Sequence, residues 1–142
     1  MNIHVKIWDA NFEDDMMEVI VSLIRKYDCV KHVYFMTTND MVIKKVMNFA
    51  PDICVCVGWD GNKEPLSIVE RAIALGAPKV QLFKPYFNQQ SVDMAHEHGI
   101  LCNVFLADDP EEAIQYREMG IDCILTNDYL AIKNALDGHA SK

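Results

Sequence analysis

The amino-acid sequence predicts an α/β fold built from about six parallel strand–helix units. Apolar runs of strand length recur along the chain, and after each of them apolar residues recur at helical spacing. Most of these runs are apolar at nearly every position, which is typical of parallel strands buried on both faces. One unit takes roughly 20 to 25 residues, and no motif recurs between units, which favours βα units over a solenoid.

The first two units lie before Pro51. Alternating residues predict a strand over 3–7, and its helix begins at the acidic residues 13–15, where the positive end of a helix dipole favours carboxylates. A β-rich run predicts the second strand over 32–36. Its helix begins at the capping residues 37–40 and is closed by the proline.

The third and fourth units follow the same order. A continuous apolar run predicts a strand over 53–57, and the helix over 65–76 has proline in its first turn and glycine at its end. The fourth strand is expected over 79–83. Its helix is expected over 89–98, ending before a glycine.

The last two units complete the chain. A strand is expected over 100–106, followed by a helix over 109–120 that begins with an aspartate cap, a first-turn proline and a carboxylate three residues after the cap. The final strand is expected over 123–126 and the final helix over 129–136. Two architectures fit this order: an open doubly wound sheet, or a piece of a (β/α)₈ barrel.

The length of the chain and its glycine usage bear on the choice between these two architectures. A complete (β/α)₈ barrel needs on the order of 200 to 250 residues, whereas this chain has 142. Any barrel is therefore incomplete. All six glycines are isolated, so the glycine-rich loops that hold nucleotide phosphates are absent.

The composition is that of one folded domain over residues 1–142, with 51% hydrophobic and 24% charged residues. The 13 Lys and Arg against 21 Asp and Glu give a net charge of −8, which argues against a nucleic-acid partner. No window approaches the ~20 apolar residues of a spanning helix, and the N-terminus lacks a secretory pattern. We therefore expect a cytoplasmic protein without a membrane partner.

The five cysteines are an odd set scattered through apolar runs, and we interpret them as reduced core thiols. Cys54 and Cys56 share one face of a strand, but no second pair lies at zinc spacing. His96 and His98 are two residues apart in a predicted helix, so they face different ways and are expected at the surface.

Four segments resemble the C-terminal part of the glycerophosphodiester phosphodiesterase family: 76–83, 95–105, 108–113 and 119–128. The family's last barrel strand reads Gly-Ile/Val-Asp-x-Ile-x-Thr-Asn/Asp, and this chain has Gly-Ile-Asp-Cys-Ile-Leu-Thr-Asn over 120–127. Upstream, residues 3–6 and 49–52 resemble the family's third strand and the helix end after its fourth. The resemblance implies an incomplete TIM (β/α) barrel, formed by the last six of about eight βα units.

The resemblance also exposes what is missing for catalysis. The family uses His-Arg-Gly at its first strand, Glu-x-Asp at its second and a further His, none of which this chain has. Its third-strand Glu-x-Lys, which holds a divalent metal (Mg²⁺ or Ca²⁺) and the phosphate, reads His4-Val5-Lys6 here. The resemblance therefore implies hydrolysis of a glycerophosphodiester to an alcohol and glycerol 3-phosphate as the family reaction, but an inactive chain with no cofactor of its own. The alternative is a non-catalytic binding or assembly module with a flavodoxin-like open sheet.

The candidate site residues follow from these positions, and no residue is assigned as catalytic. His4 is a candidate metal ligand in place of the family's Glu, assisted by Asp9, or else a polar rim residue. Lys6 and Lys84 are candidate phosphate ligands at strand ends, where barrel active sites gather; for Lys84 the competing interpretation is a solvated loop lysine.

Three aromatic residues are candidates for an apolar substrate-facing wall, with ordinary packing as the alternative: Trp8, Trp59 and Phe105. A six-stranded piece of a barrel also leaves two strand edges and the interior open. The pattern therefore predicts self-association, most simply a two-fold dimer through the open barrel edges.

Overall fold

Strands and helices alternate regularly along residues 1–6 and 14–140, which are the residues described by this computed structural model. The strands are β1 (Asn2–His4), β2 (Tyr34–Thr37), β3 (Cys54–Val57), β4 (Lys79–Leu82), β5 (Leu101–Phe105) and β6 (Cys123–Leu125). The helices are α1 (Asp14–Lys26), α2 (Asp40–Phe49), α3 (Ser67–Leu75), α4 (Gln89–Glu97), α5 (Pro110–Glu118) and α6 (Tyr129–Ala140), with a short 3₁₀ helix over Val30–His32.

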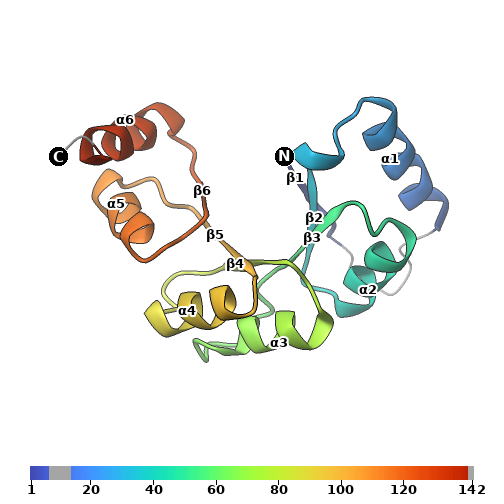
Figure 1. The fold of residues 1–142 in the computed structure, drawn as a ribbon, viewed down its shortest axis with the longest axis horizontal. Coiled ribbons are helices and arrows are strands. Elements are labelled where there is room, and N and C mark those ends of the chain that lie inside the picture. Colours follow the sequence, from blue (N-terminus) through green and yellow to red (C-terminus); the bar gives the residue numbers. More distant parts are fainter. Residues whose placement is uncertain (7–13, 141–142) are drawn as a thin grey trace.

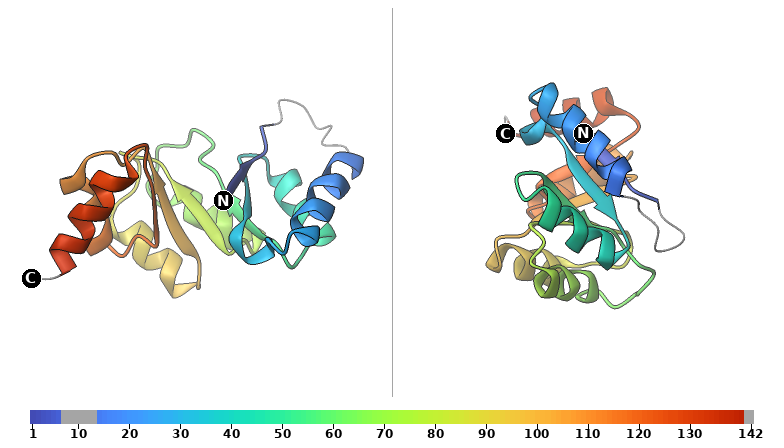
Figure 2. Two further views of the ribbon diagram at one scale, coloured as in Figure 1. Left: turned by 90° about the horizontal axis from the view of Figure 1, so that it is seen from above. Right: turned by 90° about the vertical axis from the view of Figure 1, so that its right-hand side faces the viewer.

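The strands form one parallel sheet in the order β1-β2-β3-β4-β5-β6. This order confirms the predicted incomplete TIM barrel, because barrel strands pair with their sequence neighbours. A flavodoxin-like sheet has the order 2-1-3-4-5, so that alternative was wrong. The sheet curls across the molecule with the helices on its outer side (Figures 1 and 2).

Several element boundaries differ from those expected. The second strand begins at Tyr34 rather than His32, because the His32 amide donates to Cys29 O at 2.9 Å within the 3₁₀ helix. The third helix begins at Ser67 rather than Pro65, since Ser67 closes a turn by donating from its N and Oγ to Glu64 O. The expected end of the first strand, residue 7, lies outside the described residues.

Two predicted N-caps are confirmed, but the Glu112 carboxylate, expected to complete a capping box with Asp109, accepts from Lys84 and Tyr116 instead. Asn39 Oδ1 accepts from the amides of Met41 and Val42, and the Asp109 side chain caps α5 ahead of its first-turn proline. Gly76 ends α3 in the left-handed conformation at φ 68°, which glycine adopts without the steric cost of a Cβ.

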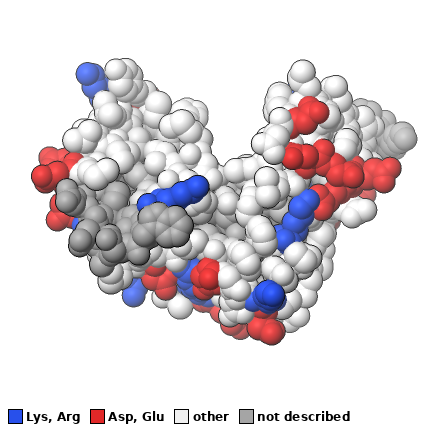
Figure 3. Space-filling view, turned by 180° about the vertical axis from the view of Figure 1, so that it is seen from behind, with Lys and Arg blue, Asp and Glu red and all other residues white. Residues whose placement is uncertain are grey.

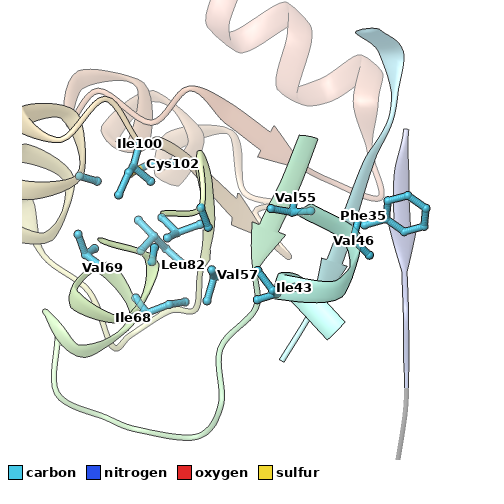
Figure 4. Packing of buried hydrophobic residues seen from close by; sticks show 14 of the residues in the cluster. Phe35, Ile43, Val46, Val55, Val57, Ile68, Val69, Leu82, Ile100 and Cys102 are labelled. Atoms are coloured by element: carbon cyan, nitrogen blue, oxygen red, sulfur yellow. The ribbon is translucent and has the colours of Figure 1, made fainter. Parts of the chain in front are cut away.

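The hydrophobic core lies between the outer face of the sheet and the helices. Val55 and Val57 of β3 face Ile43 and Val46 of α2, and all four are nearly inaccessible to solvent (Figure 4). Burial of each such side chain contributes about 1.5 to 3 kcal/mol. This layer explains why the strands read as apolar runs.

The inner face of the sheet carries several polar side chains that bond to one another. Asn103 Nδ2 donates to Tyr34 Oη at 3.1 Å, and Asn2 Nδ2 donates to Gln81 Oε1 at 3.4 Å. Each bond joins strands that are not neighbours in the sheet, so these side chains meet across the barrel interior. Lys79 Nζ lies 4.6 Å from the Tyr34 ring centroid. Among the described residues, the buried Oδ1 atoms of Asn2 and Asn103 have no hydrogen-bond partner.

The interior is open on one side. The space-filling view shows a hollow between the part that carries α5 and α6 and the part that carries β1 and α1 (Figure 3). Acidic side chains gather over the α5 and α6 end of the molecule (Figure 3). Within residues 1–6 and 14–140, no helix combines the length and apolar character that crossing a membrane requires.

Candidate functional site

A cavity of about 290 Å³ lies at the carboxyl ends of the strands, where barrel enzymes place their active sites. Its lining residues come from β1, β2, β4, β5 and β6 and from the segments that follow β2 and β3: Asn2, His4, Met36, Thr38, Gly58, Trp59, Gln81, Phe105 and Leu125. The structure thus brings together His4, Trp59 and Phe105, three of the residues expected from the sequence.

His4 ends β1 and is solvent-exposed. Partial burial lowers the pKa of its imidazole, and the nearby charge of Lys6 lowers that pKa further. The imidazole is therefore neutral at pH 7 and offers a lone pair to a proton or a metal ion. Lys6 lies two residues after His4, and its positive charge acts on the His4 imidazole. Lys6 does not line the cavity.

An aromatic wall, which we define as Trp59, Phe83, Tyr86 and Phe105, borders the cavity. Trp59 stacks on Phe83 with ring centroids 4.3 Å apart, and Phe83 lies 5.1 Å from Phe105. Tyr86 stacks on Trp59 at 5.5 Å. The stacking fixes the wall as one apolar surface. Phe83 and Tyr86 were missed from the sequence, although Phe83 directly follows a strand, as Trp59 nearly does.

Arg71 of α3 ties the segments after β2 and β3 together beside the cavity. Its guanidinium donates to Asp40 Oδ1 at 2.7 Å, to Gly58 O at 2.9 Å and to Thr38 O at 2.5 Å. Its side chain is only 15% exposed. Because Thr38 and Gly58 both line the cavity, Arg71 fixes the cavity rim. The sequence analysis missed this residue.

Lys84, predicted to bind phosphate, forms an ion pair with Glu112 of α5, with Nζ and Oε2 2.7 Å apart. The opposite oxygen of Glu112 accepts from Tyr116 Oη at 2.9 Å. The Lys84 side chain is about one-third exposed but does not line the cavity. The contact with Glu112 gives Lys84 a structural partner that competes with any anion.

Asp108 joins the loops that follow β5 and β6. It accepts from Thr126 Oγ1 at 2.8 Å, from the Asn127 amide at 2.7 Å and from Asn127 Nδ2 at 2.9 Å. These bonds lower the pKa of the Asp108 carboxyl, and the bond from the Asn127 backbone amide has the largest effect. The carboxylate is thus used to organise two loops.

The lining residues do not fit a hard divalent cation. Mg²⁺ and Ca²⁺ prefer carboxylate oxygens, and no carboxylate occurs among the nine described lining residues. His4 offers a nitrogen, while Asn2, Gln81 and Thr38 offer neutral oxygens. Asp9, expected to assist His4, and Trp8, expected in the apolar wall, lie outside the described residues.

A parallel sheet in sequential order, wrapped by helices and hollowed at the carboxyl ends of its strands, defines a (β/α) barrel protein in which part of the barrel is present. Residues 2–131 match the model of the glycerophosphoryl diester phosphodiesterase family. The chain therefore belongs to the glycerophosphoryl diester phosphodiesterase family. The comparison with curated proteins gives no significant match.

Solved structures show the same fold. A candidate glycerophosphodiester phosphodiesterase from Galdieria sulphuraria superposes with a TM-score of 0.83 at 23% identity, over 96% of this chain and 56% of that one. A glycerophosphodiester phosphodiesterase from Parabacteroides distasonis gives 0.76 at 18% identity, over 98% and 57%. An Oleispira antarctica phosphodiesterase, solved with its product sn-glycerol-3-phosphate, gives 0.66 at 17%, over 84% and 49%. The chain spans about half the length of these structures.

Proposed function

We propose that this chain, taken alone, is a non-hydrolytic member of its family that retains a cavity for a small polyol phosphate. The observation that carries the proposal is the chemistry of the cavity: an imidazole, amides and an aromatic wall, with no carboxylate among its described lining residues. The cavity has the family's position on the fold and lacks the acidic side chains that the family's metal chemistry uses.

Hydrolysis of a phosphodiester makes three demands on a site. The charge on the non-bridging oxygens must be neutralised, a nucleophile must be activated, and the departing alkoxide needs a proton. His4, neutral at pH 7, is able to accept one proton. A second acid–base group and a metal-binding set are not found among the described lining residues, so two of the three demands are unmet.

Binding makes smaller demands. The Oleispira antarctica neighbour carries sn-glycerol-3-phosphate, and the same class of ligand suits this cavity. The aromatic wall offers an apolar surface to the carbon face of a polyol, and Gln81 and Thr38 offer hydrogen bonds to its hydroxyl groups. Lys6 is the proposed partner of the phosphate, with Lys84 as a weaker one because Glu112 already holds it.

The test is a hydrolysis assay on the purified chain with glycerophosphocholine, with and without Mg²⁺, Ca²⁺ or Mn²⁺. We expect no release of glycerol 3-phosphate above the metal-only background. The matched control is Lys6→Ala. Metal-dependent turnover that this variant abolishes would overturn the proposal, whereas equal turnover by both proteins would indicate a contaminating hydrolase. Glycerol 3-phosphate is expected to change the tryptophan fluorescence of the native chain, and less so in Lys6→Ala.

A second proposed role is assembly. In the described sheet β1 and β6 each have a strand neighbour on one side, and the polar interior opens to solvent between them. A second copy of the chain covering these edges would satisfy their free backbone groups. We also propose a reducing compartment such as the cytoplasm, since all five cysteines are free.

A further inference from the structure

Three side chains with different donor atoms converge at the amino ends of the last strands, at the opposite end of the sheet from the cavity. They are His96 of α4, Cys102 of β5 and Asp122, which directly precedes β6. The His96 ring nitrogen, the Cys102 Sγ and an Asp122 carboxylate oxygen all lie within 4.8 Å of one another. We propose that this triad, His96–Cys102–Asp122, binds a zinc-like divalent cation.

The backbone holds the triad in place. Asp122 Oδ2 accepts from the Cys102 amide at 2.7 Å, and the Asp122 amide donates to Cys102 O at 3.0 Å. His96 Nε2 lies 3.0 Å from the same Oδ2. A Cβ at Gly120 would come within 3.3 Å of His96 Cε1, so the glycine leaves room for the imidazole ring. Two of the three donors are thus already in contact.

The distances suit a tetrahedral ion after a small adjustment. Zinc binds Cys sulfur at about 2.3 Å and His nitrogen or carboxylate oxygen at about 2.0 to 2.2 Å, so neighbouring donors around it lie roughly 3.3 to 3.7 Å apart. The 3.0 Å separation of His96 and Asp122 is close to that spacing. The sulfur needs to approach by at most about 1.5 Å from the 4.8 Å limit, and His96 and Asp122 need to separate by about 0.3 to 0.7 Å.

The donor set selects the class of ion. Sulfur and imidazole ligands favour zinc over Mg²⁺ and Ca²⁺, which prefer oxygen alone. A thiolate and a carboxylate carry two negative charges, which balance a divalent cation. Cysteine binds such an ion as the thiolate. Binding therefore releases the thiol proton to solvent.

The site is accessible from one side. Cys102 is fully buried, whereas the side chains of His96 and Asp122 are 41% and 31% exposed. Asp122 also lines a cavity of about 420 Å³ that α5, β6 and α6 border. An ion bound by the three side chains would take a water as its fourth ligand. The ion would link α4 to β5 and β6, at the end of a barrel where structure rather than catalysis is usual.

Cobalt(II) is the probe, because a thiolate bound to it gives a charge-transfer band in the near ultraviolet. We expect one equivalent of Co²⁺ to produce this band in the native chain and Zn²⁺ to remove it. Cys102→Ser is expected to abolish the band, and His96→Gln to weaken Co²⁺ binding at least tenfold. Cys123→Ser and His98→Gln, a neighbouring thiol and imidazole outside the triad, are the matched controls and should retain the band.

A thermal measurement covers the case in which the cysteine variant fails to fold. Zn²⁺ should raise the melting temperature of the native chain above its value in EDTA, because an ion that binds only the folded state stabilises it. The exposed His96→Gln substitution should remove that rise without changing the value in EDTA by more than a few degrees. Absence of the cobalt band in the native chain, or its loss in Cys123→Ser instead of Cys102→Ser, would overturn the proposal.

Discussion

At the scale of single residues, the cavity rim depends on side chains that bridge consecutive βα units. Arg71 reaches from α3 to the segments after β2 and β3, where it donates to two carbonyl oxygens and to the Asp40 carboxylate and forms a longer ion pair with Asp60 at 3.5 Å. Its hydrogen-bond partners lie 13 to 33 residues away in the chain. Arg71 therefore fixes the carboxyl ends of β2 and β3 relative to each other. The positions of Thr38 and Trp59, which follow these strands, depend on that spacing.

Arg71→Ala tests this bridging role. Removing the guanidinium leaves the Gly58 and Thr38 carbonyl groups without their charged donor, so we expect a loss of about 1 to 3 kcal/mol in the free energy of unfolding. Urea denaturation followed by circular dichroism measures it. Arg25→Ala is the control, because Arg25 pairs with Asp52 in an exposed bridge, which contributes little. An equal loss in both variants would contradict the bridging role.

His4 was predicted from the resemblance, because it stands where the family's third strand has Glu, and Trp59 and Phe105 were predicted as an apolar wall. In the structure His4 and Phe105 end their strands and Trp59 follows β3, so all three reach the same cavity at the carboxyl ends of the strands. Arg71 and Asp108 were not predicted. Their roles depend on bonds between different units, and a pattern of apolar spacing carries no information on which polar side chains meet.

At the scale of elements, the predicted order of strands and helices is confirmed, and the differences lie at their ends. β1 spans only Asn2–His4, and α6 continues to Ala140 beyond its expected end at Leu136. End positions depend on local hydrogen bonds such as the turn at Glu64 and Ser67, which apolar periodicity does not encode. The loops after β5 and β6 show the same dependence, since Asp108 joins them.

The Asp108 bonds predict a dependence of stability on pH. Its folded-state pKa is lowered, so the carboxylate stabilises the folded chain at pH values above the ordinary Asp pKa, and this contribution is lost as pH falls through the folded-state value. Asp108→Asn should therefore melt at a lower temperature than the native chain near pH 7, and the difference should shrink as pH falls below the ordinary Asp pKa.

Thermal melts at several pH values measure this difference. Asp93→Asn, which changes an exposed carboxylate within α4, is the matched control and should follow the native chain at every pH. A constant difference between Asp108→Asn and the native chain across the acidic range would show that the Asp108 charge does not carry the effect.

At the scale of the whole molecule, the half-barrel presents a polar interior to solvent. The unpartnered Oδ1 atoms of Asn2 and Asn103 face this interior, and buried acceptors of this kind call for donors. The sequence predicted the open edges from the number of units, but not the polar interior. Along each strand, residues that face the interior alternate with apolar residues that face the helices. The strand register shows which residues belong to which face.

Self-association is the prediction that belongs to this scale. The chain has a mass of 16.2 kDa, so a dimer has 2 × 16.2 = 32.4 kDa. We expect light scattering after size-exclusion chromatography to give the dimer mass at micromolar concentrations. Dilution should shift the equilibrium toward the smaller species. A single 16.2 kDa species at every concentration would rule out the assembly role.

The sequential strand order has a consequence for how the chain acquires its structure. Each strand hydrogen-bonds to the strand of the adjacent unit, so every new βα unit docks onto one that is already complete. Each pairing closes a loop of one βα unit, which costs less loop-closure entropy than pairing with a more distant strand. During synthesis the units can consolidate one after another as they leave the ribosome, with β6 and α6 added last. The half-barrel is thus suited to vectorial folding, with the interior hydrogen bonds from Asn2 to Gln81 and from Asn103 to Tyr34 added once the later units are in place.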